Sequence, residues 1–257
     1  NLNSFNMTIQ APVTASMSGT SMAAPTLTGN ALLVRQFFAD GYYPRGEKQA
    51  ADAYNPTGAA LKAILLNSTN TSTNAAAGWP NTGTGWGRAW LDGNLWFNDT
   101  MAGGDDSRRL RLFERSNGAG LQTGGVNEYT IDNVQAGSEL RATLVWFDAD
   151  AAPGATSALI NNLDLEVIGP GGTYLGNVFS GGASQTGGSA DNKNTVEQVR
   201  LPAPSAGAYT FRVKAGNVPG NGAEGSDRQG YALAVSGRFA IPDPAVFPAP
   251  TSVHASR

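Results

Sequence analysis

Residues 18–25 read Ser-Gly-Thr-Ser-Met-Ala-Ala-Pro and open a long apolar run. A serine in the first turn of a helix lies where unpaired amides and the helix dipole favour negative charge. An acyl-transfer nucleophile suits that position, since its own N–H stabilises the oxyanion that forms as the hydroxyl attacks. Gly19 allows the tight turn that such a site needs. The stretch therefore predicts a nucleophile at Ser21, against the simpler alternative that Ser21 is only an N-cap.

Two helices are predicted in the first hundred residues. Residues 20–39 are apolar around most of a helical surface, which predicts a buried helix that Gly41 ends. The side chains behind this prediction are Ala31, Leu32, Val34, Phe37 and Phe38. A second helix follows Thr57, a good N-cap residue, and has apolar residues at helical spacing, namely Leu61, Ile64 and Leu65. A short third segment is expected over residues 91–97.

Near residue 102 the spacing of apolar residues changes from helical to alternating. Every second residue is then apolar in four runs, at residues 140–146, 163–167, 209–213 and 231–235. Glycine-rich turns separate these runs, and no helical pattern lies between them. The alternation predicts an antiparallel β-sandwich or barrel over residues 103–240. Residues 241–257 are rich in proline and are expected to form a linker.

The composition is that of an exported enzyme rather than of a nucleic-acid-binding protein. Of the 257 residues only 14% are charged, the net charge is −3, and no basic run suggests a nucleic-acid or membrane partner. Cysteine is absent, which excludes disulfides and thiolate chemistry. No stretch is long and apolar enough to form a membrane helix, and residues 1–7 do not resemble a signal peptide. We expect a secreted monomer, and we expect the chain to be a fragment of a longer protein.

Residues 19–25 closely resemble the nucleophile signature of the subtilisin-like serine proteases. Gly29-Asn30, residues 61–63 and residues 85–88 are similar to closing elements of the subtilase catalytic domain. Residues 144–148 and 161–165 are similar to the C-terminal β-barrel of the oxidatively stable alkaline serine proteases. The G-x-S-x-G elbow of α/β-hydrolases is not matched, because Ala23 stands where that pattern has glycine.

The resemblance implies both an architecture and an activity. Residues 1–102 would be the end of an α/β subtilisin-like catalytic domain, followed by a β-sandwich or jelly-roll-like barrel over 103–240 and the linker over 241–257. The activity would be that of a serine endopeptidase acting on proteins or peptides. Ser21 would be the nucleophile and a backbone oxyanion donor, and Thr20 a secondary oxyanion contact. The triad aspartate and histidine would lie upstream, since subtilisins order the triad Asp, His, Ser.

Two other functions are compatible with the sequence. The chain could be a non-catalytic β-sandwich binding module that carries an inactive protease remnant, or a serine esterase. The intact string over residues 19–25 disfavours the binding module, and the missing elbow glycine disfavours the esterase. The single histidine, His254, lies in the proline-rich tail and is not expected to serve as the general base.

Oxygen donors in the β region are candidate calcium ligands. The related alkaline proteases hold calcium in this part of the chain, and Ca²⁺ prefers six to eight oxygen ligands. The resemblance therefore implies a structural calcium site, for which the candidate ligands are Asp148, Asp164, Asp191, Asn194 and Glu197. The simpler alternative is that these residues only shape turns, which Asp and Asn favour in any case.

Tryptophans and arginines near the junction are expected to pack rather than to bind a ligand. Most of the tryptophans fall in the first hundred residues, at Trp79, Trp86, Trp90 and Trp96, and Trp146 lies in the β region. Such residues more often fill cores and seams than form sugar-binding platforms. The arginines of the junction, Arg108, Arg109, Arg111 and Arg115, are expected to make interdomain contacts or a solvated face.

We predict that the isolated chain has no useful proteolytic activity. Loss of a triad partner lowers kcat by roughly 10⁴- to 10⁶-fold, and this chain would lack two partners. The measurement is hydrolysis of a chromogenic peptide by the purified chain, with Ser21→Ala as the control. Robust turnover that disappears in Ser21→Ala would contradict this prediction.

Overall fold

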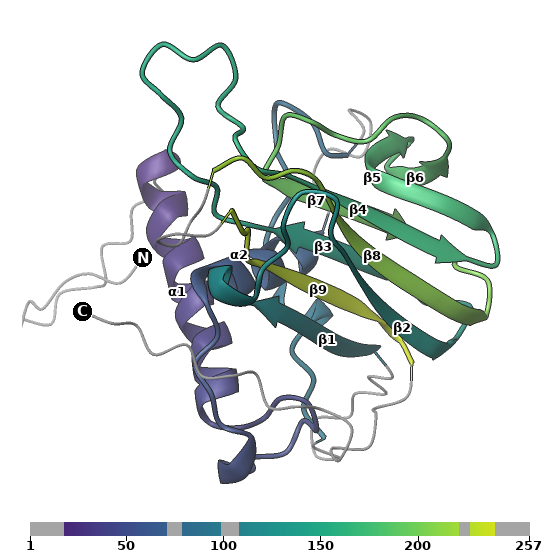
Figure 1. The fold of residues 1–257 in the computed structure, drawn as a ribbon. Helices are drawn as coiled ribbons and strands as arrows, with labels where there is room; N and C mark the ends of the chain where they lie inside the picture. The colour runs from purple at the N-terminus through teal and green to yellow at the C-terminus, as the bar shows by residue number, and fades with distance from the viewer. Residues whose placement is uncertain (1–17, 71–78, 99–107, 221–226, 240–257) are drawn as a thin grey trace, which may run out of the picture.

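The computed structural model describes residues 18–70, 79–98, 108–220 and 227–239. Two antiparallel sheets face each other, one helix covers the outer face of one sheet, and a second helix packs against the first (Figure 1). The predicted antiparallel β-rich region is therefore confirmed. Its predicted start near residue 103, the linker over 241–257 and His254 lie outside the described residues. Within the described ranges, no helix is long and apolar enough to cross a membrane.

The strands form a four-stranded and a five-stranded sheet. The order in the first sheet is β1-β9-β3-β7, and in the second it is β2-β8-β4-β5-β6. Every named strand pair is antiparallel. The strands are β1 (Arg108–Arg115), β2 (Val126–Val134), β3 (Leu140–Val145), β4 (Asn162–Gly169), β5 (Gly172–Ser180), β6 (Ala183–Thr186), β7 (Val196–Leu201), β8 (Gly207–Asn217) and β9 (Tyr231–Arg238).

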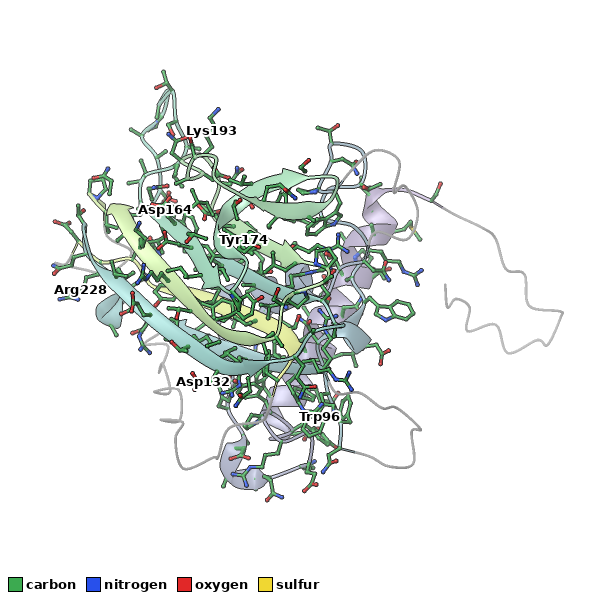
Figure 2. All side chains as sticks on the ribbon, turned by 90° about the vertical axis from the view of Figure 1, so that its right-hand side faces the viewer. Trp96, Asp132, Asp164, Tyr174, Lys193 and Arg228 are labelled. Atoms are coloured by element: carbon green, nitrogen blue, oxygen red, sulfur yellow. The ribbon has the colours of Figure 1, made fainter. Side chains whose placement is uncertain are left out.

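The main core lies between the two sheets. The alternating residues of β4, Leu163, Leu165 and Val167, point into this core and are fully buried. Phe211 and Val213 of β8 join them from the same sheet, and β3 and β9 contribute from the other sheet. Figure 2 shows Asp164, which alternates with these core residues, toward the same end of the molecule as Lys193. The period-two pattern in the sequence thus predicted the core face of β4 and β8 correctly.

The four-stranded sheet differs from the expected pattern, because both of its faces are buried. All six residues of β3 are buried, including Arg141 and Thr143, which alternate with its apolar residues. Helix α2 (Gly58–Asn67) packs on the outer face of β3 and β9 and removes that face from water. A second core of α2 and β9 residues fills this layer, including Ala60, Ile64, Ala232 and Ala234.

Both predicted helices form, and their ends follow from the sequence. Helix α1 spans Thr20–Ala39 and is followed by Gly41, whose φ of 77° suits a residue without a side chain. Thr57 caps α2 by accepting a hydrogen bond from the Ala60 N–H at 3.2 Å. The predicted third segment contains only the single 3₁₀ turn η3 (Leu91–Gly93). Two further 3₁₀ turns are η1 (Ala50–Asp52) and η5 (Asn117–Ala119).

The prediction that the first helix is buried is wrong for most of its length. Only Val34, Phe37 and Phe38 of α1 are buried, all in its C-terminal half, where the helix packs against α2. Leu27, Leu32 and Leu33 remain 47%, 62% and 54% exposed. The sequence pattern correctly indicates that α1 is largely apolar. Among the residues that the structure describes, however, α2 and its neighbours cover only the C-terminal end of α1.

Charged side chains of the sheet hold both ends of α2. At its start, the Glu114 carboxylate of β1 accepts hydrogen bonds from the Thr57 N–H at 3.1 Å and the Thr57 hydroxyl at 2.6 Å. At its end, the Arg141 guanidinium donates to the carbonyls of Asn67 at 3.0 Å and Thr69 at 2.5 Å. A negative charge near a helix N-terminus and a positive charge near its C-terminus both interact favourably with the helix dipole and stabilise the helix. The sheet therefore selects the direction in which α2 lies.

A buried network of polar side chains continues from the end of α2 into the sheet. The Asn67 amide donates to Ser236 of β9 at 2.8 Å and to Asn94 at 3.3 Å, and its oxygen accepts from Thr143 at 2.9 Å. Gln198 of β7 then donates to Thr143 at 2.7 Å. Buried polar groups stabilise a fold only when they are paired, so this network requires the helix and the sheet to fit each other.

We predict that Arg141→Met strongly destabilises the protein. Arg141 also pairs with Glu139 at 2.7 Å, and burial lowers the pKa of Arg141 to about 10 although Glu139 raises it. The substitution leaves Glu139 with Arg200 at 2.6 Å as its closest remaining partner, but it leaves the buried Asn67 and Thr69 carbonyls without this donor. Each unpaired carbonyl should cost about 1–3 kcal/mol of unfolding free energy. Urea unfolding provides the measurement.

The matched control is Arg212→Met on the outer face of the five-stranded sheet. Arg212 also bridges two carboxylates, those of Glu128 and Glu166, but its side chain is 37% exposed. We expect a loss below about 1 kcal/mol there. Equal losses for the two variants would contradict the role assigned to Arg141.

A second prediction concerns pH and Glu114. Burial raises the pKa of Glu114, and the hydrogen bonds from Thr57 and Tyr54 only partly oppose this. The folded state therefore binds the proton more tightly than the unfolded state, so the free energy of unfolding should fall as pH rises through the raised pKa.

Glu114→Gln should remove this contribution. Between pH 4 and 7, the unfolding free energy of the variant should rise relative to that of the wild type, by about 1.4 kcal/mol per unit by which the pKa is raised. Urea titrations at several pH values test this. Parallel pH profiles for the two proteins would count against it.

Candidate functional site

Ser21 lies in the open first turn of α1. Gly19 precedes the helix with φ 154° and ψ 163°, and its carbonyl accepts the N–H groups of Met22 at 3.0 Å and Ala23 at 3.1 Å. The N–H groups of Thr20 and Ser21 therefore precede the first intrahelical hydrogen bonds. Both residues are exposed. An anion at this end of α1 would meet free amides and the positive end of the helix dipole.

The sequence left open whether Ser21 is a nucleophile or only the N-cap of the helix, and its position in α1 bears on the second alternative. The N-cap of α1 is Gly19, and no side chain caps the helix by a hydrogen bond. Ser21 is the second helical residue, so it is not the N-cap. The part of the chain that the structure describes contains no histidine. The structure thus places the Ser21 hydroxyl at a helix N-terminus. The described residues provide no histidine that could act as its general base.

Helix α1 is fixed by its other end. The ring of Phe38 packs between Tyr43 and Tyr54, with ring centroids 5.0 and 5.1 Å away. The Tyr43 hydroxyl accepts the Leu112 N–H of β1 at 2.9 Å, which ties this aromatic cluster to the edge of the four-stranded sheet. The nucleophile candidate therefore lies at the far end of a helix whose base is held by α2 and β1.

Asp148 is engaged by the amides of its own loop. Its carboxylate accepts hydrogen bonds from Ala149 at 2.8 Å, Ile160 at 2.6 Å and Asn161 at 2.8 Å. Asn161 then pairs with the buried Gln229 at 2.8 Å. These bonds close the loop between β3 and β4, which is the role that the turn-forming alternative predicted for such residues.

Asp191 and Asn194 lie together in the loop before β7. The Asp191 carboxylate accepts from the amides of Asn177 and Asn194, both at 2.6 Å, and from the Lys193 N–H at 2.9 Å. Burial raises the pKa of Asp191, but these hydrogen bonds outweigh burial and lower it overall. Four of the five candidate calcium ligands, all except Asp148, belong to β4, β7 or this loop.

Asn177 of β5 links this loop to the edge of the other sheet. Its side-chain amide donates to the Val196 carbonyl at 2.8 Å, and its oxygen accepts the Gln198 N–H at 3.0 Å. One side chain thus satisfies a carbonyl and an amide of β7 as a neighbouring strand would. Its φ of 61° lies in the left-handed region, where asparagine is among the better tolerated residues.

Glu197 has the most unusual environment of the predicted ligands. Its side chain on β7 is fully buried, and its Oε2 accepts the Leu165 N–H of β4 at 2.7 Å. Its Oε1 has no hydrogen-bond partner among the described residues, and neither has the buried Oδ1 of Asn162. Burial, together with the nearby carboxylates of Asp164 and Asp191, raises the pKa of Glu197 well above its usual range.

The sequence predicted Asp164 and Glu197 as oxygen ligands but did not predict their neighbour Asn162. Asn162 donates to the Asp164 carboxylate at 3.2 Å, and the charge of Asp164 helps to raise the pKa of Glu197. Asn162 was not among the predicted ligands. Asparagine is uncommon in β-strands, so its presence at the start of β4 is a sequence signal that could have pointed to Asn162. Among the described residues, no three Asp, Glu, His or Cys side chains are grouped closely enough to hold a metal ion.

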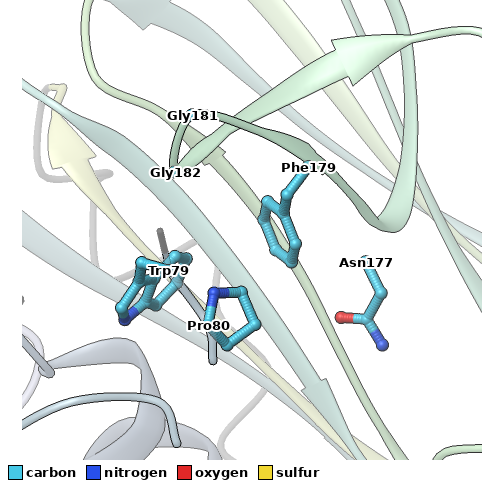
Figure 3. A pocket seen from close by; sticks show the side chains of 6 residues that line it. All are labelled: Trp79, Pro80, Asn177, Phe179, Gly181 and Gly182. Atoms are coloured by element: carbon cyan, nitrogen blue, oxygen red, sulfur yellow. The ribbon is translucent and has the colours of Figure 1, made fainter. Parts of the chain in front are cut away.

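The aromatic and arginine side chains pack largely as predicted. Trp79, Trp96 and Trp146 are buried, and Arg109 of β1 stacks on Trp96 at 3.7 Å from the ring centre. Arg141 and Arg200 each lie 5.2 Å from the Trp79 ring. Trp79 also helps to line a pocket of about 370 Å³ whose other walls are Pro80, Asn177, Phe179, Gly181 and Gly182 (Figure 3).

Comparison with known proteins identifies the family that the first part of the chain resembles. Residues 2–87 match the model of the subtilase family, and this range contains Ser21. The chain is 30% identical over 244 residues to the serine protease/ABC transporter B family protein tagB of Dictyostelium discoideum. It is 29% identical over 248 residues to tagD, a protein of the same description and organism. These findings show that residues 2–87 are similar to the subtilase family and that the chain is similar to part of two proteins described as serine proteases.

The chain spans only a small part of these relatives. Each alignment covers 79% of this chain but 13% of the relative. Among solved structures, a periplasmic inhibitor of g-type lysozyme from Aeromonas hydrophila matches 50% of this chain and 82% of its own, at 16% identity and a TM-score of 0.22. A Sulfurospirillum deleyianum protein matches 52% and 99%, at 8% identity and a TM-score of 0.26. Such low TM-scores carry no argument about fold or function.

Proposed function

We propose that this chain is part of a secreted, monomeric subtilisin-like serine endopeptidase that cleaves proteins or peptides. The observation that carries the proposal is the position of Ser21, in the open first turn of α1 and within the residues that match the subtilase family. A nucleophile in this position has its own amide available to the oxyanion. The serine-protease relatives support the same class of reaction.

The reaction follows from this geometry and from two groups that the parent protein must supply. A histidine, oriented by an aspartate, accepts the Oγ proton of Ser21 as Oγ attacks the carbonyl carbon of the scissile peptide bond. The tetrahedral oxyanion is held by the Ser21 N–H, with Thr20 as a secondary contact. Collapse expels the amine, which takes its proton from the histidine and leaves an acyl-enzyme. Water then releases the acid and regenerates Ser21.

The exposed leucines of α1 fit this proposal. Leu27, Leu32 and Leu33 lie on a helix whose C-terminal half alone is covered by α2. Full burial of a fully exposed leucine is worth roughly 1.5–3 kcal/mol, so covering the exposed half of each side chain would contribute about half of that. We propose that the remainder of the catalytic domain packs around the uncovered part of α1 and brings the histidine and the aspartate to Ser21.

Ser21→Ala in the longer parent protein tests the catalytic assignment. We expect kcat for a peptide substrate to fall by about 10⁶-fold with little change in KM, since the nucleophile acts in the chemical step. The control is Thr28→Ala, which removes another exposed hydroxyl from the same helix, one that bonds only the Ala24 carbonyl at 3.0 Å. This control should retain near-normal turnover.

Two outcomes would overturn the assignment. If the parent protein with Ser21→Ala cleaves as fast as the wild type, Ser21 is not the nucleophile. If the folded wild-type parent has no measurable activity and fails to react with a fluorophosphonate, the alternative of a binding module with an inactive protease remnant is favoured.

We propose further that Ca²⁺ stabilises the β-sandwich at Asp164 and Glu197, with Asn162 as a neutral ligand. The unpaired Oε1 of Glu197 and Oδ1 of Asn162 are buried acceptors that a hard cation would satisfy. A cation would also offset the repulsion among the carboxylates of Glu197, Asp164 and Asp191. The oxygens of Asp148 and Asp191 already accept several N–H donors, so these two residues and Asn194 would act by shaping the loops.

Thermal unfolding in EDTA and in millimolar CaCl₂ tests this proposal. Calcium at 100 times its Kd should add about 2.7 kcal/mol to the unfolding free energy and raise Tm accordingly. Glu197→Gln should fold but lose most of this gain. Asp148→Asn should keep the gain even if it lowers the baseline stability. Equal calcium responses in the wild type and Glu197→Gln would refute the site.

A further inference from the structure

No further inference is drawn: the strongest candidate, the pocket between Trp79-Pro80 and the turn that joins β5 to β6 (Figure 3), has the amide of Asn177 already hydrogen-bonded within the protein, and nothing in the structure shows what covers its apolar walls.

Discussion

The side chain of Arg141 is almost fully buried, and it remains tolerable there because protein groups replace the water that it loses. Glu139 supplies the opposite charge, and two carbonyls at the end of α2 accept hydrogen bonds from Nη1 of Arg141. A buried charge with good partners roughly repays its desolvation, whereas one without them is very costly. The four-stranded sheet therefore requires α2 at this place. Glu114, at the other end of α2, has the opposite sign, so the helix fits in only one direction.

This constraint also determines how the nucleophile candidate is held. A helix of twenty residues is about 30 Å long, and α1 is anchored only over its last turns, where Phe37 and Phe38 meet α2 and the aromatic cluster. The end that carries Ser21 thus extends away from its anchor. Small changes in how α2 sits on the sheet would be carried along the helix to Ser21, although no β-strand residue lies in the proposed site.

The sequence predicted the local structure well and the layered packing poorly. Thr57 and Gly41 bound helices as expected, because capping and positive φ depend on a few neighbouring residues. The pattern over residues 140–146 predicted β3 but not that both faces are buried, since α2 reaches it from about seventy residues earlier in the chain. The motif at Ser21 was recognisable because a helix start needs only adjacent residues. The unpaired oxygens near Glu197 depend on β4, β5 and β7 meeting, which no local pattern encodes.

The hydrogen bonds of the Asn177 side chain affect how readily the β7 edge can pair with another molecule in solution. An edge strand such as β7 presents a row of amides and carbonyls on which a strand from another molecule can add. Asn177 already occupies the Val196 carbonyl and the Gln198 amide, and it does so from within its own chain. An incoming strand would have to displace it. Asn177, together with Ser184 of β6, which accepts the Arg200 N–H at 2.9 Å, therefore protects this edge against aggregation, as lysine, proline or a β-bulge does on the edges of other sheets.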